Sequence, residues 1–306
     1  MDLDVVYDRR GAGEPLVLLH GIGHHWRAWL PVLDRLAAAH DVIAIDLPGF
    51  GESPVPRSGL PRHMPEVVTA VMQTVAALGV DRPHVAGNSL GGAIALELAA
   101  AGRVASATAL SPAGFCTPRE LRWALGVLTA HRLAARLPEP VLRSVFNLTP
   151  LRALSFGMVF ARPDRLALDA ALADARALRG ARAFRAVAKA GRGYAFQGAP
   201  TVPVTIAWGT RDRILPYRQA ALARQRLPRA RHVDLHGCGH VPMHDDPDLV
   251  ASVILATTGA AVGEPAGTRP GRLDRTATAS GLSGGPTGGD RRVQDEPDAL
   301  PTPGRS

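Results

Sequence analysis

Residues 84–100 read HVAGNSLGGAIALELAA and place a serine at an abrupt junction between two kinds of secondary structure. An apolar, β-branched run precedes Ser89, and a run of alanine and leucine with helical spacing follows it. Gly87, Ser89 and Gly91 fit the pattern G-x-S-x-G. A turn from strand to helix at one residue strains that residue's backbone, and side chains two positions away would collide across it. The stretch therefore predicts a strand–turn–helix that holds the Ser89 hydroxyl at a helix N-terminus, as a nucleophile requires.

Strand-like and helical patterns alternate along most of the chain. Strong apolar runs lie at 15–21, 40–49, 83–89 and 202–210, and weaker ones at 103–112 and 231–237. Helical patterns lie near 28–39, 63–79, 90–101, 217–227 and 246–257. This alternation predicts an α/β protein with a mostly parallel, doubly wound sheet that is buried on both faces. Such a sheet binds its ligand at the carboxyl ends of its strands.

Two segments depart from this alternation. Residues 114–196 are rich in Arg, Ala and Leu, and they contain helical patterns without a convincing strand. We expect an all-helical cap over the ligand crevice, inserted between core segments 1–113 and 197–257; the alternative is helices that pack on the flank of the sheet. Residues 258–306 are rich in Gly, Pro, Ser and Thr and poor in apolar residues, so we expect a disordered tail.

Composition limits the class of protein. The formal net charge of the 306 residues is +8, and residues 115–200 alone carry +9. No DNA-binding motif or aromatic-interleaved basic stripe accompanies that charge, so we expect a small-molecule substrate and no nucleic acid. The opening MDLDVVYDRRG is not a targeting segment, and no long apolar run follows, so we expect a cytoplasmic protein without a membrane span. We expect Cys116 and Cys238 to be free thiols. The oligomeric state stays open.

A serine nucleophile needs a base, and the base needs an acid that orients it. His240 lies in a glycine-flanked loop after the last weak strand, within GCGHVPMHDDP (237–247). His244 is the alternative base. Together the two histidines have the i, i+4 spacing of a metal-binding pair on a helix, but Pro242 between them argues against a helix there. Asp212 directly follows the strand-like run at 203–209 and is the expected acid. The alternatives are that Asp212 only pairs with a neighbouring arginine, or that the acid is Asp234, Asp245 or Asp246.

The first strong strand ends in His20-Gly21-Ile22-Gly23. We expect the backbone N–H groups of Ile22 and Leu90 to form an oxyanion hole, and His20 to brace the turn. His24, His25, Trp26 and Trp29 follow and are expected to line the mouth of the pocket or the first helix, with His24 and Trp26 as candidates for substrate binding. We expect no cofactor and no metal, because the sequence has no glycine-rich phosphate loop and no cluster of metal ligands.

With these motifs in order, the sequence resembles the α/β-hydrolase fold. The matching pieces are HGIG (20–23), DLPGFGES (46–53), GNSLGG (87–92), WGTRDRILP (208–216) and GCGHVPMHDDP (237–247). The resemblance implies a catalytic triad in the chain order Ser89, Asp212, His240. It also implies antiparallel strands at the N-terminal edge of the sheet, which here are shortened to one at residues 2–8. The resemblance does not identify the substrate, since this fold hosts many hydrolases.

The nucleophile narrows the reaction. A serine argues against the dehalogenases and epoxide hydrolases of this fold, so we expect a carboxylic ester or lactone hydrolase that forms an acyl-enzyme. The alternative is a C–C bond hydrolase of vinylogous diketo acids. GNSLGG resembles the nucleophile turn of that subgroup of enzymes, and Arg185 or Arg192 would hold the acidic substrate. Val241 argues against it, because that subgroup is expected to have a tryptophan there. A binding or receptor protein with slow turnover on the same scaffold is a third hypothesis.

Overall fold

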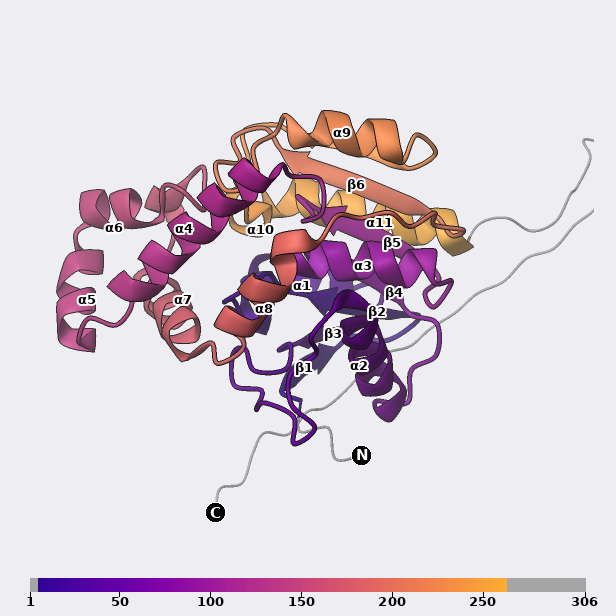
Figure 1. Cartoon of the computed structure of the whole chain (residues 1–306), viewed down its shortest axis with the longest axis horizontal. Helices are drawn as coiled ribbons and strands as arrows, with labels where there is room; N and C mark the ends of the chain where they lie inside the picture. Colours follow the sequence, from indigo (N-terminus) through magenta and orange to yellow (C-terminus); the bar gives the residue numbers. More distant parts are fainter. Residues whose placement is uncertain (1–4, 263–306) are drawn as a thin grey trace, which may run out of the picture. The chain divides into compact units, whose positions relative to one another are not determined.

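The computed structural model describes residues 5–262, which contain a seven-stranded sheet with helices on both faces (Figure 1). The strands are β1 (Tyr7–Arg10), β2 (Pro15–Leu19), β3 (Asp41–Ile45), β4 (His84–Asn88), β5 (Ser106–Leu110), β6 (Val204–Gly209) and β7 (Arg231–Leu235). Their order in the sheet is β1-β3-β2-β4-β5-β6-β7. β1 is antiparallel to β3, and the other neighbours are parallel. The predicted α/β architecture is confirmed.

The five inner strands, β2 to β6, are buried along almost their whole length because both faces of the sheet are covered. Val17 and Leu19 of β2 belong to one hydrophobic cluster, while Leu16 and Leu18 belong to the other. The first cluster contains buried residues of α2 (Met64–Ala77), α3 (Leu90–Ala100) and α9 (Gln219–Arg226). The second contains those of α1 (Leu30–Ala37), the short α10 (Pro242–Asp245) and α11 (Pro247–Val262). Burial on two sides removes the polar alternation that a half-exposed strand would show.

The edge strand lies later in the chain than the predicted 2–8. β1 pairs with β3 from Tyr7 opposite Ile45 to Arg10 opposite Val42, and residues 1–4 lie outside the described part. The sequence pattern did not mark this strand, because its charged side chains contact acidic partners and not the core. Arg9 Nη2, for example, lies 2.6 Å from Asp41 Oδ2. Charged side chains are common on exposed edge strands, where they discourage pairing with other chains.

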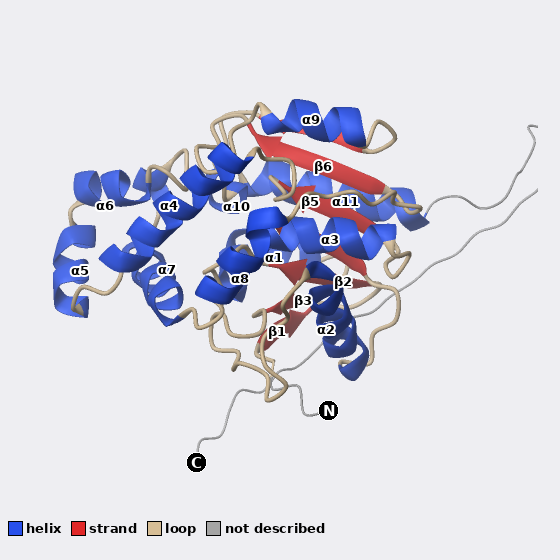
Figure 2. Cartoon of the chain, in the orientation of Figure 1, coloured by secondary structure: helices blue, strands red, loops and turns tan. Residues whose placement is uncertain are grey.

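Residues between β5 and β6 form helices and loops only, as Figure 2 shows by colour, so the predicted all-helical insertion is confirmed. The α-helices are α4 (Pro118–Ala134), α5 (Glu139–Asn147), α6 (Thr149–Phe156), α7 (Leu168–Gly180) and α8 (Phe184–Ala190). α4 begins at a capping box in which Thr117 Oγ1 accepts from the Glu120 N–H and the Glu120 carboxylate accepts from the Thr117 N–H.

The last helix corrects the predicted end of the core at residue 257. α11 continues to Val262, and Thr258 within it is buried with its hydroxyl 2.8 Å from His40 Nε2. The rest of the predicted tail, 263–306, lies outside the described residues. Within residues 5–262, no helix combines the length and the apolar character needed to cross a bilayer.

Candidate active site

Ser89 occupies the strained turn between β4 and α3. Its backbone has φ 57° and ψ −111°, a conformation that residues other than glycine rarely adopt. A Cβ on Gly87 would lie 2.1 Å from the Gly91 carbonyl oxygen, and one on Gly91 would lie 2.0 Å from that of Leu19 in β2. Both glycines are therefore needed, one for the turn itself and one for its approach to the neighbouring strand. The turn predicted from G-x-S-x-G is present.

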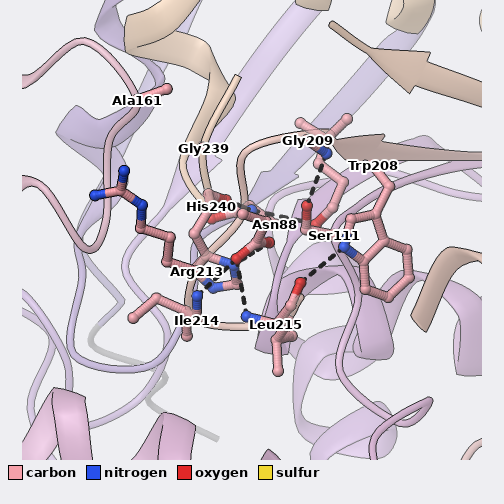
Figure 3. A network of polar contacts seen from close by, with 12 residues as sticks. Asn88, Ser111, Ala161, Trp208, Gly209, Arg213, Ile214, Leu215, Gly239 and His240 are labelled. Carbon is pink, nitrogen blue, oxygen red and sulfur yellow. Dashed lines mark hydrogen bonds and ion pairs between the residues drawn. The ribbon is translucent and has the colours of Figure 1, made fainter. Parts of the chain in front are cut away.

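Asp212 and His240 meet at the carboxyl ends of β6 and β7. Asp212 Oδ2 lies 2.8 Å from His240 Nδ1, and the Asp212 side chain is completely buried. Asp212 Oδ1 accepts hydrogen bonds from the backbone N–H groups of Ile214, at 2.9 Å, and Leu215, at 2.8 Å (Figure 3). Trp208 Nε1 donates to the Leu215 carbonyl and closes this turn. Three donors thus satisfy a buried carboxylate, which suits an acid that orients an imidazole.

The arginines beside Asp212 are not its partners. Arg213 Nη1 donates to the Gly157 carbonyl at 2.9 Å, which ties this turn to the insertion. The rival acids are also engaged elsewhere: Asp234 forms an ion pair with Arg224, and Asp246 accepts from the Leu249 N–H at the start of α11.

The loop that carries His240 is fastened to the end of the insertion. The His240 N–H donates to the Val159 carbonyl at 2.9 Å. The buried Asp245 carboxylate accepts from the Gly239 N–H at 2.7 Å and from the Ala161 N–H at 3.0 Å. Gly239 has no room for a side chain, because its Cβ would lie 2.7 Å from the Ala161 nitrogen. Asp245 therefore positions the loop, and the insertion helps to place the imidazole.

Asn88, which sequence reasoning passed over, links the serine turn to the histidine loop. It is buried, and its Nδ2 donates to the His240 carbonyl at 2.8 Å and to the Leu110 carbonyl at 3.2 Å. The only signal in the sequence was a polar residue at the end of an otherwise apolar strand, next to the expected nucleophile. Its partner is 152 residues away, so the contact could not be read from the pattern.

The loop after β2 lies against Ser89. A Cβ on Gly21 would come within 3.3 Å of the Ser89 Cβ. His20 braces this loop: its Nε2 accepts from the Leu47 N–H at 2.9 Å, so its Nδ1 carries the proton and donates to the Gly21 carbonyl at 2.7 Å. Burial lowers the pKa of His20 to about 3, which keeps the ring neutral. Among the described residues, the N–H groups of Ile22 and Leu90 donate to no other group, so both are free for a ligand.

A cavity of about 400 Å³ joins these elements. Eight of its 25 lining residues come from the core, and 17 come from residues 128–178 of the insertion. The core contributes Gly21, Ile22, Gly23, His24, Asn88, Ser89, His240 and Val241. The insertion contributes mostly Ala, Val, Leu and Phe, and Asp174 is the one charged acid or base in the lining apart from histidines. The space is therefore mostly apolar, and Asn88, Ser89 and His240 bring polar groups to it from the core.

The structure does not bring all predicted pocket residues to this cavity. His24 lines it, but Trp26 does not; the Trp26 N–H donates to Asp46 at 2.6 Å and so helps to hold the loop. Arg185 on α8 and Arg192 after it are exposed and absent from the lining. The expected contact between a basic residue of the insertion and an acidic substrate therefore has no counterpart here. Arginine charge is easily kept in water because the long side chain reaches the surface.

His24, His25 and Asp174 form a polar cluster between the core and α7. His25 Nε2 lies 2.9 Å from Asp174 Oδ1, and His24 Nε2 lies 3.8 Å from the same oxygen. Burial lowers the pKa of His24 to about 4. Burial acts to raise the pKa of Asp174, but the two histidines outweigh it and leave it below its usual value. Histidine and aspartate can both ligate zinc, and one ligand atom from each of the three residues lies within 4.8 Å of the others. The sequence pattern did not reveal this cluster, because Asp174 is 149 residues from His25. The hydrogen bond between His25 and Asp174 gives these two side chains a partner without a metal ion.

The chain belongs to the alpha/beta hydrolase family, whose sequence model matches residues 16–253. It is 30% identical over 281 residues to a pimeloyl-[acyl-carrier protein] methyl ester esterase of Xanthomonas campestris, covering 83% of this chain and 97% of that protein. It is 29% identical over 265 residues to an uncharacterised protein of Mycobacterium tuberculosis, covering 80% and 75% of the two chains. Among solved structures it is similar to a bacterial membrane phospholipase A, with a TM-score of 0.66, 28% identity and coverage of 85% and 84%. The expected α/β-hydrolase family is thereby confirmed.

Proposed function

We propose that this hydrolase cleaves carboxylic esters or lactones with an apolar acyl part, through an acyl-enzyme on Ser89. The observation that carries the proposal is the cavity of about 400 Å³, which has Ser89 and His240 in its lining and apolar side chains of the insertion as its walls. Removing an acyl chain from water into such a space contributes roughly 0.8 kcal/mol per buried methylene. The insertion then acts as the predicted cap.

The roles of the three polar residues follow from their hydrogen bonds. Asp212 accepts the Nδ1 proton of His240, which leaves Nε2 as the basic nitrogen. In the proposed first step, Nε2 takes the Ser89 proton while the serine oxygen bonds to the ester carbonyl carbon. His240 then gives that proton to the alcohol oxygen as the ester bond breaks.

The free N–H groups of Ile22 and Leu90 are suited to hold the negative oxygen of the tetrahedral intermediate. Leu90 stands at the first turn of α3, where the helix dipole adds to this effect. In the second step, His240 removes a proton from water, and the resulting hydroxide attacks the acyl carbon. The carboxylic acid leaves, and Ser89 recovers its proton.

The cavity disfavours the alternative C–C bond hydrolase. A diketo acid substrate carries a negative charge, and burial of that charge needs a cationic or strongly hydrogen-bonding partner. No Arg or Lys is found in the lining among the described residues, and the acid that is present, Asp174, would repel the substrate.

The test is turnover of p-nitrophenyl esters with acyl chains from two to sixteen carbons, together with labelling by a fluorophosphonate probe. We expect a higher kcat/KM for medium or long chains than for acetate, and labelling at Ser89. Ser89→Ala should lose labelling and at least about 10³-fold in kcat. Ser155→Ala is the matched control, because Ser155 lines the same cavity but its hydroxyl donates only to the Leu151 carbonyl.

Each part of the proposal can fail separately. Full activity in Ser89→Ala would remove Ser89 as the nucleophile. A preference for acetate over longer chains would contradict the apolar acyl site. Labelling of Ser89 without turnover of any ester or lactone would favour the binding or receptor protein instead.

A further inference from the structure

Exposed apolar side chains are concentrated on one part of the insertion. Nine large hydrophobic residues are exposed in the described chain, and six of them lie within residues 133–154. These six, called the apolar ridge below, are Leu133, Leu137, Val141, Leu148, Leu151 and Leu154. They lie at the end of α4, in α5 and α6, and in the turns that join these helices. Figure 1 places α5 and α6 on the side of the insertion away from the sheet. A group of exposed apolar residues of this kind marks an interaction surface.

Helix α5 carries apolar side chains both toward the cavity and toward the surface. Leu142 and Phe146 of α5 point inward and line the cavity, whereas Val141 on the same helix is 44% exposed. A helix that covers a core normally turns polar residues outward. Leu137 and Leu154 belong to both surfaces, since they line the cavity and are 46% and 79% exposed. Apolar surface therefore continues from the ridge into the cavity that contains Ser89.

Positive charge accompanies the ridge. Arg136 is exposed and forms no ion pair with any residue in the described range. The acid in this stretch is Glu139, whose Oε1 lies 2.5 Å from Arg176 Nη2 and 3.8 Å from Arg143 Nη2. Arg176 therefore neutralises Glu139, and the charge of Arg143 stays largely uncompensated. Burial and the nearby charge of Arg136 lower the pKa of Arg132, a sign of crowded positive charge. This surface would attract anions.

We propose that the apolar ridge docks on an anionic lipid bilayer, and that acyl chains enter the cavity from the bilayer. The second half rests on the proposed function; the docking itself does not. Leucines flanked by arginines suit a surface with an apolar interior and negative headgroups. A symmetric dimer through the ridge would also bury the leucines, but it would bring the arginines of two copies together. Charge therefore favours lipid over a second copy.

Docking is measured with the full-length Ser89→Ala protein, so that it does not depend on turnover. The assay is co-sedimentation with vesicles of phosphatidylglycerol or of phosphatidylcholine. We expect binding to phosphatidylglycerol that is at least tenfold stronger than binding to phosphatidylcholine and that weakens as salt rises. Absence of binding to phosphatidylglycerol overturns the proposal.

Two double variants locate the surface, and neither touches residues of the cavity lining. Arg136→Gln with Arg143→Gln should weaken binding about 30-fold, from roughly 1 kcal/mol per cation. Leu148→Gln with Leu151→Gln should weaken it on the order of tenfold or more. The matched controls are Arg229→Gln and Leu30→Gln, which change exposed residues outside the ridge and should leave binding unchanged.

The outcomes separate docking from the proposed function and from self-association. Turnover of a water-soluble short ester by the wild-type chain reports the function alone, and both ridge variants should keep it. Vesicle binding that survives both double variants overturns the docking surface. A second result would also overturn the docking surface: the chain forms a dimer in analytical ultracentrifugation, the leucine variant dissociates that dimer, and no form of the protein binds vesicles.

Discussion

Asp212→Asn is the sharpest test of the proposed triad, because the hydrogen bonds around Asp212 dictate how an asparagine would sit. The carboxylate oxygen Oδ1 accepts from two backbone N–H groups, those of Ile214 and Leu215, and Oδ2 faces His240 Nδ1. Asparagine has one acceptor oxygen and one donor nitrogen. If its oxygen keeps the two backbone donors, its NH₂ group points at the imidazole.

The energies favour that orientation. The reversed amide would place its NH₂ against two buried N–H groups, and each buried unsatisfied donor costs about 1–3 kcal/mol. With the NH₂ toward His240, Nδ1 must accept, so the ring proton moves to Nε2. His240 can then no longer accept the Ser89 proton. We expect kcat to fall about 10³- to 10⁴-fold, or roughly 4–5.5 kcal/mol in activation free energy, with little change in KM.

The assay is steady-state hydrolysis of the best p-nitrophenyl ester, with urea unfolding of each variant to show that the fold is intact. Asp234→Asn is the matched control, because that acid pairs with Arg224 outside the cavity lining and should leave kcat within twofold. A kcat for Asp212→Asn within tenfold of wild type would refute the reasoning, since it would mean that the base does not depend on this carboxylate.

Other substitutions test the turn, the link between loops and the buried histidine. Gly91→Ala should destabilise the fold by at least about 3 kcal/mol in urea unfolding, because the new Cβ would lie 2.0 Å from a carbonyl oxygen of β2. Gly126→Ala, in an open part of α4, should instead stabilise it by about 0.5–1 kcal/mol, and equal effects would show that packing is not the cause. Asn88→Ala removes the donor to the His240 carbonyl, so kcat should fall by more than KM rises, at a stability cost of about 1–3 kcal/mol; unchanged kcat would make Asn88 purely structural. Burial lowers the pKa of His24 to about 4, so the unfolded chain binds its proton first as pH falls. His24 should therefore contribute roughly 2 kcal/mol to the loss of stability between pH 8 and pH 5, and His24→Gln should make that loss smaller by about this amount; the same slope in the variant would contradict a neutral buried ring.

The sequence predicted the elements whose causes are local. The turn at Ser89 needs only its own glycines, and each buried strand is marked by its own apolar run. The edge strand β1 and the last turns of α11 were misplaced, because their stability comes from partners far along the chain. Thr258 belongs to the fold since its hydroxyl meets His40, and no pattern within 258–262 reports that contact.

The same distinction separates the parts of the site. Ser89 directly follows β4, and Asp212 and His240 lie in the loops that follow β6 and β7, so the carboxyl edge of a parallel sheet gathers them without further information. The cavity depends instead on how helices of the insertion pack, and no sequence pattern indicated that the arginines of the described insertion stay out of its lining. Val159 shows why the insertion cannot be treated as a separable cover. Its carbonyl accepts the His240 N–H, so any movement of the insertion that opens the cavity must either spare that bond or shift the proposed base with it.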